Sequence, residues 1–113
     1  MRTYPSISAL QQALAQAWSP ASSSRYTAAN PARGQCSVTA LVVEDLFGGE
    51  ILKTETAGGA HFYNRIDGER YDLTLSQFDG PIRYDDAPAT RGEAFADTSE
   101  AQYRALRERL GLA

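Results

Sequence analysis

GQCSVTALVVEDLFGG, residues 34–49, is the stretch that decides the fold. From Cys36 to Phe47, apolar side chains cover an arc of roughly 200° of a helix, which is wider than a surface helix needs. Gly48 and Gly49 supply the left-handed conformations that commonly end a helix. The pattern therefore predicts a central helix from about Cys36 to Phe47 that other elements cover on several sides.

The segment before this helix predicts a second helix and a long loop. Apolar residues recur at spacings of three and four and form one face of a helix that ends at Pro20, namely Ile7, Leu10, Leu14 and Trp18. Ser8 and Gln11 match a capping box at its start. Residues 19–33 have the composition of a loop, which forms either one wall of a cleft or a solvated connector.

The segment after the central helix predicts an antiparallel sheet and a last helix. Residues 50–55 read as a strand, and two aromatic and aliphatic runs around Asp67-Gly68 indicate a hairpin with a two-residue turn. Capping-box matches at Thr74 and Ser99 predict a short helix and a C-terminal helix to about residue 110. Residues 79–97 are acidic and rich in turns, with a possible strand at 82–84, and form either a lid or a structural segment.

Composition narrows the classes of function. The 113 residues fit one domain, 1–113. A net charge of −3 argues against nucleic acid or an anionic membrane as the main partner, and no apolar run approaches the roughly 18 residues that span a bilayer. The N-terminus lacks a signal-peptide pattern, and a lone cysteine indicates a reducing, cytoplasmic setting. One cysteine and one histidine cannot build a structural zinc site, so we expect neither a metal nor a cofactor.

The register of the hairpin decides whether His61 and Asp72 meet. With Asp67-Gly68 as the turn, Tyr63 lies opposite Asp72, and His61 is the diagonal neighbour of Asp72 on the same face. Diagonal Cα atoms lie about 7–8 Å apart, within reach of a hydrogen bond between these side chains. A slip of one residue would place them on opposite faces.

Cys36 lies at the expected first turn of the central helix, where unpaired N–H groups and the helix dipole favour a thiolate. We therefore expect a catalytic triad of Cys36, His61 and Asp72. The thiolate would attack the carbon of an amide or carbonyl group, and His61 would transfer protons. Asp72 would orient His61 and fix its tautomer.

Three further side chains complete the expected site. Gln35, with the backbone N–H of Cys36, is a candidate to hold the oxyanion, and Trp18 and Tyr63 are candidates to line a substrate groove. The alternative is a binding or regulatory protein in which Cys36 is a small buried hydrophobe. A third hypothesis, a redox-sensing thiol, has no resolving cysteine to support it.

Two resemblances add to this reading. The motifs GQCSVTALVVEDLFGGEILKT and HFYNRIDGERYDLTLSQF closely resemble the YunG family of small bacterial proteins, over about residues 7–78. A more distant similarity links GQC at 34–36, HFYN at 61–64 and DLT at 72–74 to transglutaminase-like and papain-like enzymes. That similarity implies a nucleophile, a proton-transferring histidine and an orienting carboxylate at Cys36, His61 and Asp72, in the same chain order.

The chain also departs from the transglutaminase pattern. Ser37 stands where a tryptophan usually follows the cysteine, and the separations between the three site residues are short. The resemblance thus implies an α+β fold with a small papain/transglutaminase-like core, in which the nucleophile helix packs on an antiparallel sheet. The departures leave little room for a substrate-binding domain, which favours hydrolysis or deamidation of a small or peptidic amide over cross-linking of two proteins. We expect a thiol hydrolase or acyl-transfer enzyme of peptidase, amidase or deamidase type.

Overall fold

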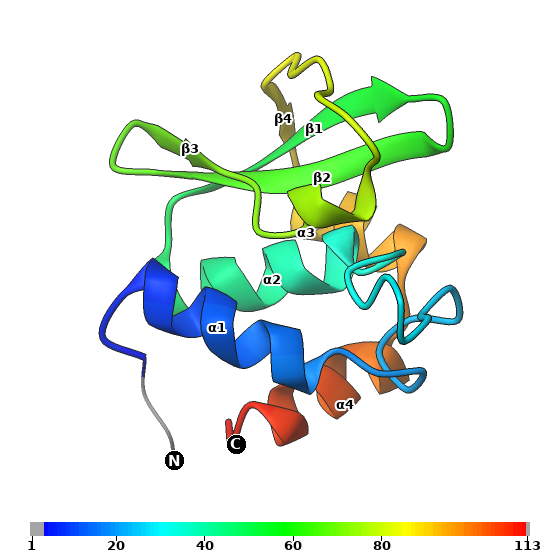
Figure 1. Ribbon diagram of the computed structural model, residues 1–113. Coiled ribbons are helices and arrows are strands. Elements are labelled where there is room, and N and C mark those ends of the chain that lie inside the picture. Colours follow the sequence, from blue (N-terminus) through cyan, green and yellow to red (C-terminus); the bar gives the residue numbers. More distant parts are fainter. Residues whose placement is uncertain (1–3, 113) are drawn as a thin grey trace.

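The computed structural model describes residues 4–112 and has an α+β architecture (Figure 1). A four-stranded sheet lies over one central helix, and two further helices lie beneath that helix. The elements in chain order are α1 (Ile7–Ala17), α2 (Cys36–Phe47), β1 (Glu50–Thr56), β2 (Gly59–Ile66), β3 (Glu69–Tyr71), the 3-10 helix η1 (Leu75–Gln77), β4 (Ala87–Ala89), α3 (Arg91–Asp97) and α4 (Glu100–Arg109).

Helix α2 is central, and its predicted bounds are confirmed. The eight residues at 36–43 are all buried, because elements cover the helix on two sides. One side packs against α1 and α4 in a cluster that includes Leu10, Leu14, Val38, Val42, Leu106 and Leu110. The other side packs against the sheet and α3 in a cluster of Cys36, Ala40, Leu41, Ile51, Phe62 and Ala94. This two-sided packing is what the broad apolar arc requires.

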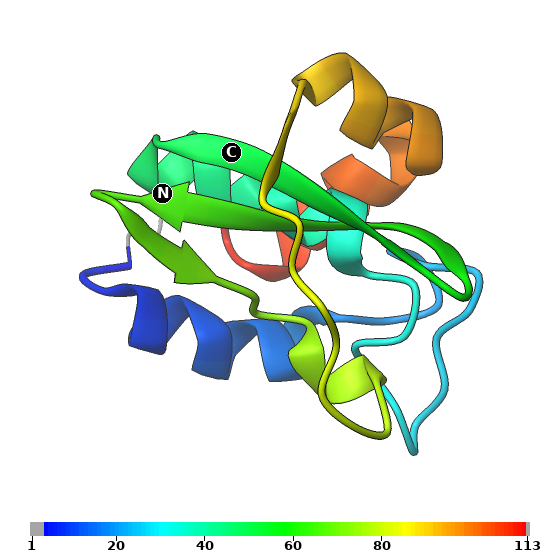
Figure 2. The same cartoon turned by 90° about the horizontal axis from the view of Figure 1, so that it is seen from above.

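The sheet has the order β3-β2-β1-β4, and every neighbouring pair is antiparallel. The predicted hairpin register is confirmed, with Asn64 opposite Tyr71 and Ile66 opposite Glu69. Alternation along β2 turns Asn64 towards α2, where its Nδ2 donates to the Ala40 carbonyl at 3.1 Å. His61 and Tyr63 therefore lie on the opposite face, which the segment before β4 crosses (Figure 2).

The two predictions for α1 and η1 need correction at their caps. Ser6, not Ser8, caps α1, because its Oγ accepts a hydrogen bond from the Ala9 N–H at 3.1 Å. The helix ends at Ala17, before Pro20 is reached. Thr74 is the N-cap residue of η1 as predicted, but its Oγ accepts a hydrogen bond from the Gln77 carboxamide and none from a backbone N–H of the helix. By contrast, Ser99 caps α4 as predicted.

Residues 79–97 hold two elements that the sequence analysis missed. The fourth strand is Ala87–Ala89, not residues 82–84, which form no strand. Helix α3 begins after Thr90, whose side chain forms a capping box with Glu93. The segment thereby completes one edge of the sheet and covers part of α2. Within residues 4–112, no helix has the length and apolarity required to cross a membrane.

Candidate active site

His61 and Asp72 form the centre of the candidate site. His61 lies near the start of β2, and Asp72 directly follows β3. The Nε2 atom of His61 is 2.7 Å from Oδ2 of Asp72, and the two side chains are only 2% and 4% exposed. The contact expected from the hairpin register is therefore present, in an environment nearly free of solvent.

Asp72 is held by further hydrogen-bond donors. The hydroxyl of Tyr84 donates to Oδ2 at 2.8 Å. On the other oxygen, Oδ1 accepts from the backbone N–H of Thr74 at 3.3 Å and from its hydroxyl at 3.4 Å. These donors fix both carboxylate oxygens, so Asp72 presents one orientation to His61. The sequence analysis did not find Tyr84, since its role comes from the path of residues 79–86 across the sheet.

Aromatic rings fix the plane of the imidazole. The Phe78 ring meets His61 edge-on at a centroid distance of 4.8 Å, and Tyr63 stacks beside it at 5.9 Å. With Nε2 engaged by Asp72, the other ring nitrogen, Nδ1, is buried and has no hydrogen-bond partner within residues 4–112. An imidazole nitrogen of this kind is free to exchange a proton with a reacting group.

The electrostatics of His61 reflect a balance between burial and two neighbours. Burial alone would lower its pKa, but the hydrogen bond with Asp72, the nearby Cys36 thiol and the charges of both groups raise the pKa of His61 to about 9. Cys36 thus raises the pKa of the imidazole, although Nδ1 forms no hydrogen bond within residues 4–112. Loose contacts of this kind are common in catalytic sites without substrate. The imidazolium form is therefore favoured at neutral pH.

Cys36 is the first residue of α2 and is 8% exposed. No side chain caps this end of the helix. The first hydrogen bond of the helix joins the Thr39 N–H to the Gln35 carbonyl at 3.0 Å. The N–H groups of residues 36–38 therefore have no hydrogen-bond partner inside the helix. These groups place a partial positive charge next to the sulfur.

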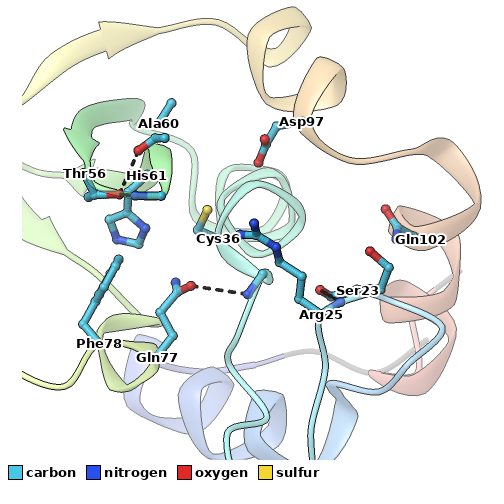
Figure 3. Close-up of a pocket in the computed structure, with 14 residues that line it drawn as sticks. Ser23, Arg25, Cys36, Thr56, Ala60, His61, Gln77, Phe78, Asp97 and Gln102 are labelled. Atoms are coloured by element: carbon cyan, nitrogen blue, oxygen red, sulfur yellow. Dashed lines mark hydrogen bonds between the residues drawn. The ribbon is translucent and has the colours of Figure 1, made fainter.

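Cys36 and His61 both line a pocket of about 310 Å³ (Figure 3). The pocket lies between the 19–33 loop, the β1–β2 turn, η1 and the ends of α3 and α4. Its other lining residues are Ser23, Ser24, Arg25, Gly34, Thr56, Gly58, Gly59, Ala60, Gln77, Phe78, Asp97 and Gln102. The loop therefore forms one wall of the pocket. Of the two alternatives for residues 19–33, the wall of a cleft is the one observed, and not the solvated connector. Most of the pocket side chains are polar.

Gln35, Trp18 and Tyr63 do not line this pocket. Gln35 is fully buried, and its Nε2 donates to the Ser19 carbonyl at 3.5 Å. Trp18 lies in the core with its indole N–H bonded to the Thr39 hydroxyl, and Tyr63 is 2% exposed with its hydroxyl bonded to Asp86. Trp18 and Tyr63 thus bury their rings and satisfy their polar ends inside the protein, whereas Oε1 of Gln35 has no hydrogen-bond partner within residues 4–112.

Gln77, which the sequence analysis did not propose, does present its carboxamide to the pocket. Its Oε1 accepts from the Gly34 N–H at 3.3 Å and its Nε2 donates to Thr74 (Figure 3). No sequence signal marks Gln77, because a 3-10 turn brings it to Gly34 from a distant part of the chain. Within residues 4–112, no group of three or more His, Cys, Asp or Glu side chains is placed to hold a metal ion.

Comparisons with known proteins extend the similarity beyond the central motifs. The family model described as YunG protein matches residues 6–112. The chain is 54% identical over 95 residues to the protein named "Uncharacterized protein YunG" of Bacillus subtilis (strain 168). The matched residues make up 84% of this chain and 83% of that protein. No solved structure matches the chain. The family match includes α3 and α4 as well as the hairpin and α2, and this chain belongs to the YunG family.

Proposed function

We propose that the protein is a thiol hydrolase or acyl-transfer enzyme that acts on an amide. Cys36 is the nucleophile, His61 the general acid and base, and Asp72 the carboxylate that orients His61. One observation carries this proposal: the imidazole is hydrogen-bonded to Asp72 through Nε2, its buried Nδ1 has no partner within residues 4–112, and His61 and Cys36 line the same pocket.

The unpaired polar atoms support a chemical role over a purely structural one. In residues 4–112, the buried side-chain atoms without a partner are Nδ1 of His61, Oε1 of Gln35 and Oγ of Ser37. Two of these residues flank Cys36 in sequence, and the third shares its pocket. A buried polar group left unsatisfied costs about 1–3 kcal/mol, and such costs gather at functional sites.

The first half of the reaction forms a thioester. The Cys36 thiolate attacks the amide carbon, a C–S bond forms, and the carbonyl electron pair moves to oxygen. The backbone N–H of Cys36, which has no partner inside the helix, is our candidate to hold the oxyanion. The imidazolium of His61 gives its proton to the amide nitrogen, the C–N bond breaks, and ammonia or an amine leaves.

The second half regenerates the thiolate. Neutral His61 accepts a proton from water, or from an acceptor amine, as that group attacks the thioester carbon. The C–S bond breaks, the product carboxylate or amide leaves, and His61 returns to the imidazolium form. Asp72 holds the imidazole in one orientation throughout, because its own position is fixed by Thr74 and Tyr84.

The same layout supports a small papain/transglutaminase-like core. The nucleophile stands at the N-terminus of a central helix, the histidine on a strand of the antiparallel sheet packed on that helix, and the carboxylate after the next strand. The chain order of the three residues is also the one that the resemblance implies. We propose this relationship on the arrangement of these parts.

A second candidate function, a non-catalytic binding or regulatory protein, is favoured by one observation. Cys36 is only 8% exposed, as expected for a structural cysteine. In that case the His61–Asp72 pair would fix the hairpin to residues 79–86, and the pocket would bind a ligand without turning it over. The accessibility and ionisation of the thiol separate the two functions.

The test is the rate of Cys36 alkylation by iodoacetamide in the folded protein from pH 5 to 10. We expect reaction at pH 6 in the wild type and a rate about tenfold or more lower in His61→Gln, since the thiolate loses its imidazolium partner. Ser24→Ala, a change at an exposed pocket residue, is the matched control and should react like the wild type. Circular dichroism checks that each variant is folded.

A product assay completes this test. With 4-nitrophenyl acetate, intact-mass spectrometry should detect an acetyl group on wild-type Cys36, and turnover should be lost in Cys36→Ser. A thiol that reacts only after denaturation would exclude the enzyme and favour the binding protein.

A further inference from the structure

We propose that the substrate carries a free carboxylate near its scissile amide and that Arg25 binds this carboxylate. The inference rests on the proposed function and specifies the substrate class of that site. It comes from Arg25, the one arginine among the described residues that lines the pocket. Arg25 belongs to the 19–33 loop and is not a member of the triad.

The backbone around Arg25 is fixed. Ser23 is 4% exposed, its hydroxyl donates to the Arg33 carbonyl at 3.1 Å, and its oxygen accepts from the Arg25 N–H at 3.1 Å. Gly34 has a φ of +73°, and a Cβ there would lie 2.4 Å from the Ser23 hydroxyl and 2.9 Å from the Arg25 Cβ. The loop is therefore packed closely against the chain that leads into Cys36.

The charge of Arg25 is not used inside the protein. Within residues 4–112, only two arginines, Arg25 and Arg33, have a guanidinium that forms no ion pair or hydrogen bond. The other arginines within residues 4–112 bind carboxylates or, for Arg109, backbone carbonyls. Only Arg25 of the two lines the pocket. Figure 3 shows its side chain extending from the loop towards Cys36.

The chemistry of the pocket selects a carboxylate. A guanidinium binds carboxylates with two parallel hydrogen bonds, which positions the bound group as well as attracting it. Asp97 directs its own carboxylate into the pocket from the end of α3, so the pocket holds one arginine and one aspartate besides Cys36 and His61 (Figure 3). That acidic neighbour repels a dianion such as phosphate more than a singly charged carboxylate.

The test compares two alkylating agents that differ in charge. Iodoacetate carries a carboxylate and iodoacetamide does not, and both place their reactive carbon at the Cys36 sulfur. We measure the ratio of the two rates, iodoacetate over iodoacetamide, for wild type, Arg25→Ala and Arg33→Ala. We expect the ratio to fall about tenfold in Arg25→Ala, the loss of one charge-assisted contact, and to stay unchanged in Arg33→Ala.

Two further variants sharpen the result. Arg25→Lys keeps the charge without the paired donors and should retain part of the preference. Asp97→Asn removes the repelling charge and should raise the ratio about twofold to threefold, an effect that salt would reduce. On the substrate side, glutaryl-4-nitroanilide and its methyl ester form a matched pair, and Arg25→Ala should raise KM for the acid more than for the ester.

The outcomes separate this proposal from the proposed function. Equal ratios in wild type, Arg25→Ala and Arg33→Ala, with rapid alkylation in all three, would overturn the role of Arg25 while leaving the thiol enzyme intact. A ratio that depends on Arg25, together with an absence of turnover, would support carboxylate binding in a protein that is not an enzyme.

Discussion

His61 and Tyr63 lie two residues apart on the same face of β2, and each is bound by a carboxylate from later in the chain. The His61–Asp72 contact has side chains that are 2% and 4% exposed, and its histidine lines the pocket. Asp86, which binds Tyr63, is also paired with Arg70, and those two charged side chains are 29% and 42% exposed. The two contacts use similar chemistry, but burial gives them different roles.

The Asp86 contact holds the segment that crosses the sheet. Its Oδ1 accepts from the Tyr63 hydroxyl at 2.9 Å, its backbone N–H donates to that hydroxyl at 2.7 Å, and its carboxylate pairs with Arg70. Tyr84 then joins the two contacts, because its hydroxyl binds Asp72 and its ring packs edge-on against Tyr63 at 4.9 Å. The segment supports the site through these contacts with Asp72 and Tyr63. We therefore interpret residues 79–97 as structural and not as a lid.

The largest expected difference between the two contacts is in stability. Asp72→Ala leaves a buried imidazolium without its carboxylate and should lower the free energy of unfolding by about 3–5 kcal/mol. Asp86→Ala breaks a partly exposed ion pair and should cost about 1 kcal/mol. Urea denaturation at pH 7 measures both. Equal losses in the two variants would show that burial does not distinguish the contacts.

The next prediction concerns pH. The pKa of His61 is raised to about 9 in the folded protein, against about 6.5 for an unperturbed histidine. The folded state therefore binds the proton more tightly, so the stabilisation is fully present below pH 6.5 and is lost as the pH rises through 9. The loss amounts to at most roughly 3 kcal/mol. Denaturation from pH 6 to 10 measures it, and His61→Gln should abolish the change.

Asp86 should show the opposite sign. Hydrogen bonds from Arg70 and Tyr63, with the charge of Arg70, outweigh burial and lower the pKa of Asp86 below its usual range. Its stabilising contribution is present above the unfolded value and disappears as the pH falls through the folded one. His61→Gln should leave this loss of stability at acid pH unchanged. If one variant removed both the loss of stability at high pH and the loss at low pH, the two contacts would not be independent.

The parts that could be predicted from the sequence depend on local signals. The bounds of α2 follow from an apolar pattern closed by Gly48 and Gly49, and the hairpin register follows from Asp67-Gly68. That register was sufficient to bring His61 next to Asp72. Each of these steps needs only residues that are close in the chain.

The remaining site residues depend on contacts between distant segments. Tyr84 reaches Asp72 because residues 79–86 cross the sheet, and Arg25 reaches the pocket because Gly34 lets the loop pack against it. Neither contact has a sequence signature. For Gln35 the sequence analysis predicted a site role that the structure does not support. Gln35 is adjacent to Cys36 in sequence, yet the geometry at the start of α2 directs its side chain to Ser19 and away from the pocket.

The smallest effect, and the most specific, distinguishes Tyr84 from Tyr63. Burial and the hydrogen bond to Asp72 raise the pKa of Tyr84, so its hydroxyl remains a donor at every working pH. Tyr84→Phe and Tyr63→Phe each remove one buried hydroxyl and should each cost about 1 kcal/mol of stability. Of the two, only Tyr84→Phe removes a hydrogen bond to Asp72, which should slow Cys36 alkylation about twofold to fivefold at pH 6.

A double-mutant cycle with His61→Gln tests whether Tyr84 acts through the histidine. If Tyr84 positions Asp72 for His61, Tyr84→Phe should have no further effect on alkylation once His61 is replaced. An equal slowing in both backgrounds would mean that Tyr84 only stabilises the fold. Because Tyr63→Phe changes the same face of β2 without touching Asp72, it shows how much of any slowing comes from the sheet alone.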